Sequence, residues 1–185
     1  YSKIAVNTFR TGLNNELKAL EYLFFSFFRS SNIEETSLTL EKALNHPQIK
    51  KSKLVEGKWK LYYSFFQFHQ GNFDEALSSL RKNSNIAQDR KGWGLGFRIL
   101  EMMITIENSD FYLMTYLLNN FNHHLNRVKE AELDRAKVIG QICRSIVRFG
   151  DDFDKIITEN TSKLKKLKEG KDVYFWNPMS YEVIR

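Results

Sequence analysis

His123, His124 and Cys143 are candidates for metal binding or for nucleophilic attack in this sequence. His123 and His124 are adjacent, so on a helix their side chains point about 100° apart, whereas helical zinc ligands are spaced by three or four residues. No acidic residue lies in the adjacent turn. Cys143 shares an apolar helical face with Ile139 and Ile142, which is typical of a buried, unreactive thiol. We therefore expect no metal site, no cofactor and no catalytic cysteine.

The remaining candidates for chemistry have structural interpretations. Asp74 and Glu75 fall in the first turn of a predicted helix, where the helix dipole favours negative charge. The glycine-rich residues 92–96 follow no predicted strand and lack the Lys-Ser/Thr ending of a phosphate-binding loop. His46 and His69 are each isolated from other candidate ligands in the sequence, and we interpret both as residues at helix ends. The sequence contains no catalytic constellation, and it predicts a protein that is not an enzyme.

The composition favours long helices in a reducing compartment. The chain has 9 glycines and 2 prolines, so helix breakers are few, and the hairpin dipeptides Asn-Gly and Asp-Gly are absent. A single cysteine excludes an internal disulfide framework, so we expect a cytoplasmic location. The most apolar stretch, residues 20–28, is roughly half of a membrane span, so we expect no membrane insertion.

The net charge of +6 leaves two classes of partner open. Short lysine groups separated by acidic residues are typical of solvated helix ends. The alternative is a nucleic-acid-binding helical-repeat protein, which concentrates positive charge on one face. That alternative requires one lysine group to share a face with a second group far along the chain, namely Lys50, Lys51, Lys53, Lys58 and Lys60 with Lys163, Lys165 and Lys166.

A short pattern recurs about every forty residues. Residues 31–36 (SNIEET) match residues 71–76 (GNFDEA) in chemistry, position by position. Residues 109–111 repeat the pattern loosely, and residues 150–154 repeat it with one extra residue. The apolar residue of each copy is spaced from the next by 40, 38 and 42 residues, at Ile33, Phe73, Phe111 and Phe153. Each copy joins two helical segments, which predicts an array of helical hairpins.

The chemistry of the turn agrees with that prediction. Gly71 can adopt the left-handed conformation that ends a helix. Asn72 with Glu75, and Asn32 with Glu35, have the spacing of a capping box that begins the next helix. The sequence therefore predicts helices over 3–29, 33–45, 52–69, 73–84, 93–107, 111–127, 132–149 and 153–168.

Two of these helices are apolar over much of their circumference. Residues 93–107 have one polar stripe, Gly94, Arg98, Glu101 and Thr105, and apolar residues elsewhere, which predicts burial on several sides. The first helix is similar, so we expect further repeats before Tyr1. We expect four hairpins in a domain over residues 1–170, followed by an aromatic tail over 171–185. Within the tail, Asn177 and Pro178 predict a short closing helix over 179–184, which either caps the array or occupies a binding surface.

The segment from Gly71 to Leu77 resembles the inter-helix turn of a tetratricopeptide repeat, in which Gly, an aromatic residue and Ala recur at these spacings. The usual family period is about 34 residues, shorter than the spacing here. The resemblance implies a right-handed stack of antiparallel hairpins, an α-solenoid of about eight helices plus the capping helix. It also implies a non-enzymatic scaffold in which the first helix of each pair lines a concave groove.

On this resemblance, a protein or peptide partner binds the inward faces of the predicted third, fifth and seventh helices. A mixed aromatic and basic groove suits an extended or helical peptide of acidic character. Aromatic stripes at helical spacing are more often core, so burial of most of these residues is the competing interpretation. The predicted partner-binding residues are Lys58, Leu61, Phe65, Phe68, Ile99, Met103, Gln141 and Arg148.

Overall fold

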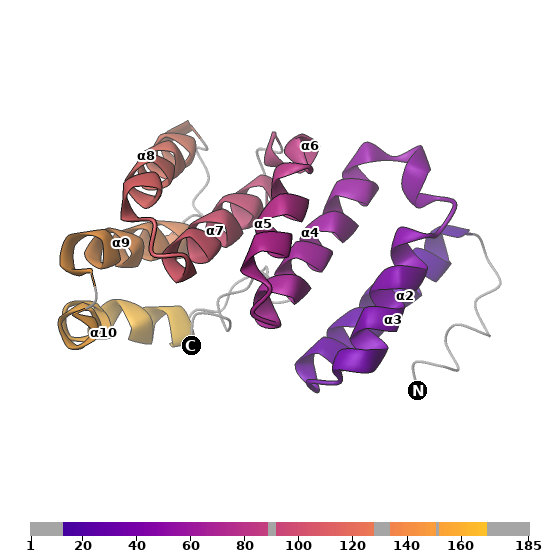
Figure 1. Cartoon of the computed structure of the whole chain (residues 1–185), viewed down its shortest axis with the longest axis horizontal. Helices are drawn as coiled ribbons and strands as arrows, with labels where there is room; N and C mark the ends of the chain where they lie inside the picture. The colour runs from indigo at the N-terminus through magenta and orange to yellow at the C-terminus, as the bar shows by residue number, and fades with distance from the viewer. Residues whose placement is uncertain (1–12, 89–91, 128–133, 151, 170–185) are drawn as a thin grey trace.

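The computed structural model describes residues 13–88, 92–127, 134–150 and 152–169 of this chain. These residues form an all-α structure of nine α-helices and one short 3-10 turn, without a strand (Figure 1). The helices are α2 (Leu13–Arg29), α3 (Ile33–Leu44), α4 (Lys53–His69), α5 (Phe73–Arg81), α6 (Ser84–Ala87), α7 (Gly92–Glu107), α8 (Phe111–Arg127), α9 (Asp134–Phe149) and α10 (Phe153–Glu169), and the 3-10 turn is η1 (Ile49–Lys51).

The helices pack mostly against their neighbours in the chain. Figure 1 shows them in chain order along the long axis, from α2 and α3 at one end to α9 and α10 at the other. Tight turns join α2 to α3, α4 to α5, α7 to α8 and α9 to α10, so the described residues contain four helical hairpins. Among the described helices, none has the length and apolar character needed to cross a bilayer.

Most predicted helices agree with the structure. Five of them match α3, α4, α7, α8 and α10 to within one residue at each end. The predicted helix 132–149 corresponds to α9, and the end of the predicted helix 3–29 corresponds to α2. Residues before Leu13, the tail over 171–185 and its closing helix over 179–184 lie outside the described residues.

The predicted helix 73–84 is wrong at its C-terminal end. Helix α5 ends at Arg81, and Asn83 leaves helical geometry with φ −104° and ψ 42°. The side chain of Asn83 is buried, and its amide donates a 2.6 Å hydrogen bond to the backbone carbonyl of Gly57 on α4. A continued helix would carry this amide away from α4, so the chain breaks and forms the short α6 instead.

The four recurrent turns share a left-handed residue. This residue is Ser31 (φ 55°), Gly71 (φ 76°), Ser109 (φ 54°) and Gly150 (φ 58°) in chain order. At the first three turns its N–H bonds the carbonyl three residues back, and the next N–H bonds the carbonyl five residues back. This is the Schellman arrangement. The fourth turn, which has the extra residue, closes with a 2.8 Å bond from the Gly150 N–H to the carbonyl of Ile146.

Side-chain caps begin three of the four second helices. Asn32, Asp110 and Asp152 each accept a hydrogen bond from the backbone N–H three residues on, at 3.2, 2.9 and 3.1 Å. The predicted cap at Asn72 is wrong. Its side chain makes no capping bond and instead donates to Gln67 Oε1 at 2.8 Å, so the helical start at Phe73 lacks a side-chain acceptor.

The core repeats with the turns. Thr36, Ala76, Met114 and Ile156 occupy the same place after each turn, and all four are buried. Helices α4 and α7 each contribute to two core clusters, one on either side. For α7, Phe97 and Leu100 pack toward α4 and α5, whereas Ile99 and Met102 pack toward α8 and α9. The predicted burial of this helix on several sides is therefore confirmed.

Candidate functional site

Helix α4 carries four of the predicted partner-binding residues, and they are packed to different degrees. Leu61 and Phe65 are 0% and 1% exposed and belong to the cluster that α4 forms with α5, α6 and α7. Phe68 is half-buried, with its ring centroid 5.5 Å from that of Phe73. Leu61 and Phe65 are therefore core residues in this structure, and they offer no surface to a partner.

Lys58 lies in a polar network that joins three helices. Its ammonium group forms an ion pair with the carboxylate of Glu21 on α2, and both side chains are mostly buried. The Lys58 ammonium also lies 5.0 Å from the ring centroid of Trp93 at the start of α7. The Tyr62 hydroxyl donates to Glu21 Oε1 at 2.7 Å, and burial followed by the Glu21 charge raises the pKa of Tyr62 well above its usual value. Lys58 is a structural cation here.

The predicted residues on α7 and α9 differ in exposure. Ile99 is 4% exposed and Met103 is half-buried, both against the core of α7, α8 and α9. Gln141 and Arg148 are exposed on α9. The Arg148 guanidinium carbon lies 5.0 Å from the ring centroid of Phe149. The structure therefore does not join the eight predicted residues into one open groove, and the exposed members lie on α9.

The exposed face of α9 is basic. Four exposed residues repeat at i, i+4, i+7 and i+11, so they lie on one side of the helix. We call this set the α9 basic stripe, and it consists of Lys137, Gln141, Arg144 and Arg148. The single acidic residue of α9 is Asp134, at its first position. Beyond the α9 turn, the Lys155 ammonium lies 4.5 Å from the ring centroid of Phe149 and extends the basic surface onto α10.

The same place in the repeat is packed in the earlier hairpins. Counted back from the left-handed turn residue, Phe65, Met103 and Arg144 are equivalent. The Phe65 ring contacts Phe28 of α2, with centroids 5.5 Å apart, and Met103 packs in the core. At this position the face that α4 and α7 bury is exposed on α9 within the described part of the chain. The residue at this position changes from apolar in Phe65 and Met103 to basic in Arg144.

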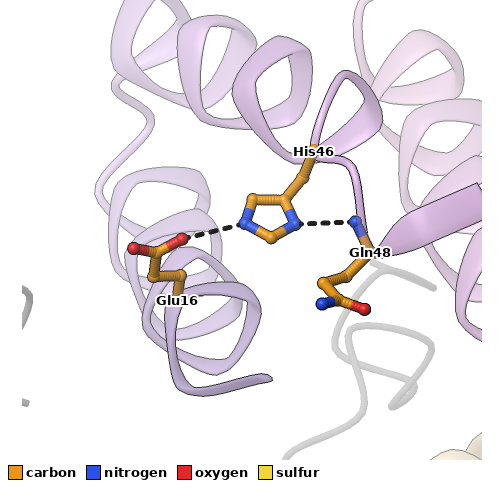
Figure 2. A network of polar contacts seen from close by, with 3 residues as sticks. All are labelled: Glu16, His46 and Gln48. Carbon is orange, nitrogen blue, oxygen red and sulfur yellow. Dashed lines mark hydrogen bonds and ion pairs between the residues drawn. The ribbon is translucent and has the colours of Figure 1, made fainter. Parts of the chain in front are cut away.

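A histidine on the α3–α4 connection has both ring nitrogens engaged. Figure 2 shows the His46 ring between the Glu16 carboxylate and the backbone N–H of Gln48. The Gln48 N–H donates to Nδ1 at 3.3 Å, so Nδ1 is an acceptor and the proton lies on Nε2, which donates to Glu16 Oε2 at 3.0 Å. The ring thus ties α2 to the end of α3, and neither nitrogen is available to a substrate.

A polar cavity of about 400 Å³ lies between α7 and α8. Burial lowers the pKa of Arg98 from its usual value, partly opposed by Glu101. Burial also raises the pKa of Glu101, partly opposed by Arg81 of α5 and by Arg98. No three histidine, cysteine or acidic residues of the described ranges are grouped to hold a metal. The cavity is lined by Arg98, Glu101, Leu117, Asn120, His123 and His124.

Two of these features were not predicted from the sequence. Glu21 is a single acidic residue among Leu20, Phe24 and Phe25, and such an isolated charge on an apolar face signals a buried partner. The polar stripe of α7 and the histidine pair of α8 were both visible in the sequence, but their convergence depends on how the two helices pack.

Comparisons with protein-family models, with curated proteins and with solved structures find no match for this chain.

Proposed function

We propose that this chain is a tetratricopeptide-like α-solenoid that acts as a non-enzymatic, peptide-binding scaffold, and that the α9 basic stripe binds an acidic peptide segment. The recurrence of one turn conformation and the packing of hairpins in chain order support the solenoid. In such an array a helical face that no neighbour covers is the natural contact surface. The kind of partner that binds there then depends on the charge and polarity of the side chains on that face.

The α9 basic stripe is the observation that carries this proposal. Three cationic side chains of the stripe lie on one exposed face, and Asp134 is the only acidic residue of the helix. Phe149, flanked by Arg148 and Lys155, adds an aromatic surface at the end of the stripe. Exposed charges of one sign favour the encounter with a partner of the opposite sign and set the salt dependence of binding. An acidic peptide with an aromatic anchor suits this surface.

Nucleic acid is the less favoured partner. Lys58 and Lys60 form ion pairs with Glu21 and Glu56, so their charges are partly neutralised. The other lysine group lies on α10, at the opposite end of the row of helices from α3 and the start of α4 (Figure 1). A duplex would need these groups on one continuous face. We therefore favour the acidic peptide, with nucleic acid as an outcome of the test.

The proposal is tested by fluorescence polarisation with a labelled acidic peptide that contains one aromatic residue. A matched peptide has Asn and Gln in place of Asp and Glu. We expect the acidic peptide to bind, the amide peptide to bind at least about tenfold more weakly, and the affinity to fall as salt rises. Equal affinity for both peptides would contradict the proposal, and tight binding of a generic DNA or RNA duplex at physiological salt would replace it with the nucleic-acid alternative.

Charge-reversal variants locate the surface. Arg144→Glu and Arg148→Glu should each weaken the acidic peptide several-fold, because both side chains are exposed and lie on the stripe. The matched control is Lys50→Glu with Lys51→Glu, which reverses two exposed charges near the other end of the molecule. The control should bind the peptide almost as the original chain does. An equal loss in the control and in the stripe variants would show that net charge, and not the α9 surface, determines binding.

A further inference from the structure

Two polar features on different helices meet at the cavity between α7 and α8. Arg98 and Glu101 lie one turn apart on the polar stripe of α7. His123 and His124, in the C-terminal half of α8, line the same cavity. The cavity involves no residue of the α9 basic stripe, so it is a separate candidate site. Its volume of about 400 Å³ is within the usual range of small-molecule sites.

Several polar side chains of this cavity make no hydrogen bond within the described part of the chain, although the charges of Arg98 and Glu101 act on each other. The side chains of Arg98, Glu101, Asn120 and His123 make no hydrogen bond or ion pair with another described residue. Arg98 and Glu101 are half-buried, so both have lost part of their hydration. Half-buried charges whose hydrogen-bonding groups are not used within the described residues can bind a ligand that supplies those bonds.

The charges around the cavity favour an anion that also carries a donor. The cavity lining holds one guanidinium group, that of Arg98, and one carboxylate, that of Glu101, so it can meet both a negative group and a donor on the same ligand. A guanidinium binds a carboxylate through two parallel hydrogen bonds. Glu101 lies beside Arg98 and can accept a hydrogen bond from a group next to that carboxylate. Asn120 and His123 supply further donors and acceptors from α8.

We propose that the α7–α8 cavity binds a small carboxylate ligand with a hydrogen-bond donor on the adjacent carbon, as in an α-amino or α-hydroxy acid. Arg98 holds the ligand carboxylate, and Glu101 accepts from the neighbouring ammonium or hydroxyl group. Asn120 and His123 close the polar side of the site, and Leu117 contributes the apolar wall. An α-amino acid and an α-hydroxy acid share this chemistry, and the titration below distinguishes them by using one probe of each kind.

The test is an NMR titration of the isotopically labelled full chain, read at the backbone amides of α7 and α8. The probes are L-alanine, L-lactate, propionate, L-alaninamide and inorganic phosphate. We expect saturable shifts with alanine or lactate, about tenfold weaker binding of propionate, which lacks the donor, and no saturation with alaninamide, which lacks the carboxylate. A preference for alanine would identify the ligand donor as an ammonium group, and a preference for lactate would identify it as a hydroxyl group. Flat titrations with all five probes, or saturation by phosphate alone, would overturn the proposal.

Variants assign the two roles. Arg98→Gln should abolish the saturable shifts of every carboxylate probe. Glu101→Gln should remove the advantage of alanine over propionate while carboxylate binding persists. Asn120→Ala changes an exposed side chain, so its fold is secure, and it should weaken alanine binding several-fold. The control is Arg144→Gln on α9, which should leave the titration unchanged even if it abolishes peptide binding. Unaltered alanine binding by both Arg98→Gln and Asn120→Ala would refute the site.

Discussion

The side-chain amide of Asn83 donates a 2.6 Å hydrogen bond to the backbone carbonyl of Gly57, which links the end of α5 to the first turns of α4. Asn83 is 3% exposed, and Gly57 is also buried. A Cβ atom at position 57 would lie 3.1 Å from Asn83 Oδ1 and 3.3 Å from the side chain of Ile86. The absence of a side chain at Gly57 therefore permits this close approach.

Gly57→Ala should destabilise the chain by about 1–3 kcal/mol, because the added methyl group displaces two buried neighbours. On helix propensity alone the same change would stabilise the chain by up to about 1 kcal/mol. The sign of the change in unfolding free energy therefore shows whether steric overlap or helix propensity dominates. The free energy of unfolding is measured by urea denaturation. In an Asn83→Ala background the clash with Oδ1 is relieved, and the two losses should be less than additive. A more stable Gly57→Ala variant would show that α6 moves away at little cost.

Glycine should be stabilising at the two serines that occupy left-handed turn positions. Ser31 and Ser109 have φ values of 55° and 54°, where an L side chain is strained, and neither side chain makes a hydrogen bond within the described residues. Ser31→Gly and Ser109→Gly should each raise the free energy of unfolding by about 0.5–1 kcal/mol after the added backbone entropy of glycine is counted. Thermal and urea denaturation measure the change.

The reciprocal substitution is the control for these turns. Gly71→Ala places a methyl group in open space at φ 76°, so any loss of stability comes from backbone strain alone. We expect a loss of about 1 kcal/mol. If Gly71→Ala and Ser109→Gly changed stability in the same direction, the left-handed conformation would not be shared by the two turns.

The sequence predicts the turns and most helix boundaries because their signals are local. A left-handed residue, a cap and an apolar marker lie within a few positions of one another, as at Ser109 and Asp110. The end of α5 is different, because Asn83 contacts a residue 26 positions earlier. The Lys58–Glu21 pair and the α7–α8 cavity likewise depend on packing between helices. These contacts join residues that are far apart in the chain, so no short spacing in the sequence predicts them.

Lys58→Glu should destabilise the chain, whereas Arg148→Glu should not. Lys58 is paired with Glu21 in a mostly buried position, so the reversal places two carboxylates together and costs about 1–3 kcal/mol. Arg148 is exposed, and its reversal should stay within about 0.5 kcal/mol. Glu21→Gln in the Lys58→Glu background should recover part of the loss, since the repulsion is removed. Equal melting temperatures for both single variants would place Lys58 outside the network.

The ring of His69 should make stability depend on pH. It packs edgewise on Phe28, with centroids 4.7 Å apart, and on Phe65 at 5.4 Å, and burial lowers its pKa below the usual value. The folded state therefore favours the neutral ring. This contribution is fully present above the unfolded pKa of about 6.5 and is lost as the pH falls through the folded pKa.

His69→Phe keeps an aromatic ring and removes the proton. The difference in unfolding free energy between the original chain and this variant should shift in favour of the variant as the pH is lowered from about 8 to about 5. Urea denaturation at several pH values measures it. A pH-independent difference would mean that the ring is solvated in the folded chain.

Cys143 should react with thiol reagents only when α9 separates from its neighbours. Its side chain is 6% exposed in the core of α7, α8 and α9, and burial raises its pKa to about 12. The thiolate, which is the reactive form, is therefore scarce at neutral pH. We expect labelling by a disulfide reagent to be at least about a hundredfold slower in the folded chain than in the urea-unfolded chain.

The control is Gln141→Cys in a Cys143→Ser background, which puts a thiol on the exposed face of the same helix and should label rapidly. Similar rates for the two positions would mean that α9 is not held against α8 in solution, and the open face assigned to the basic stripe would then be in doubt as well.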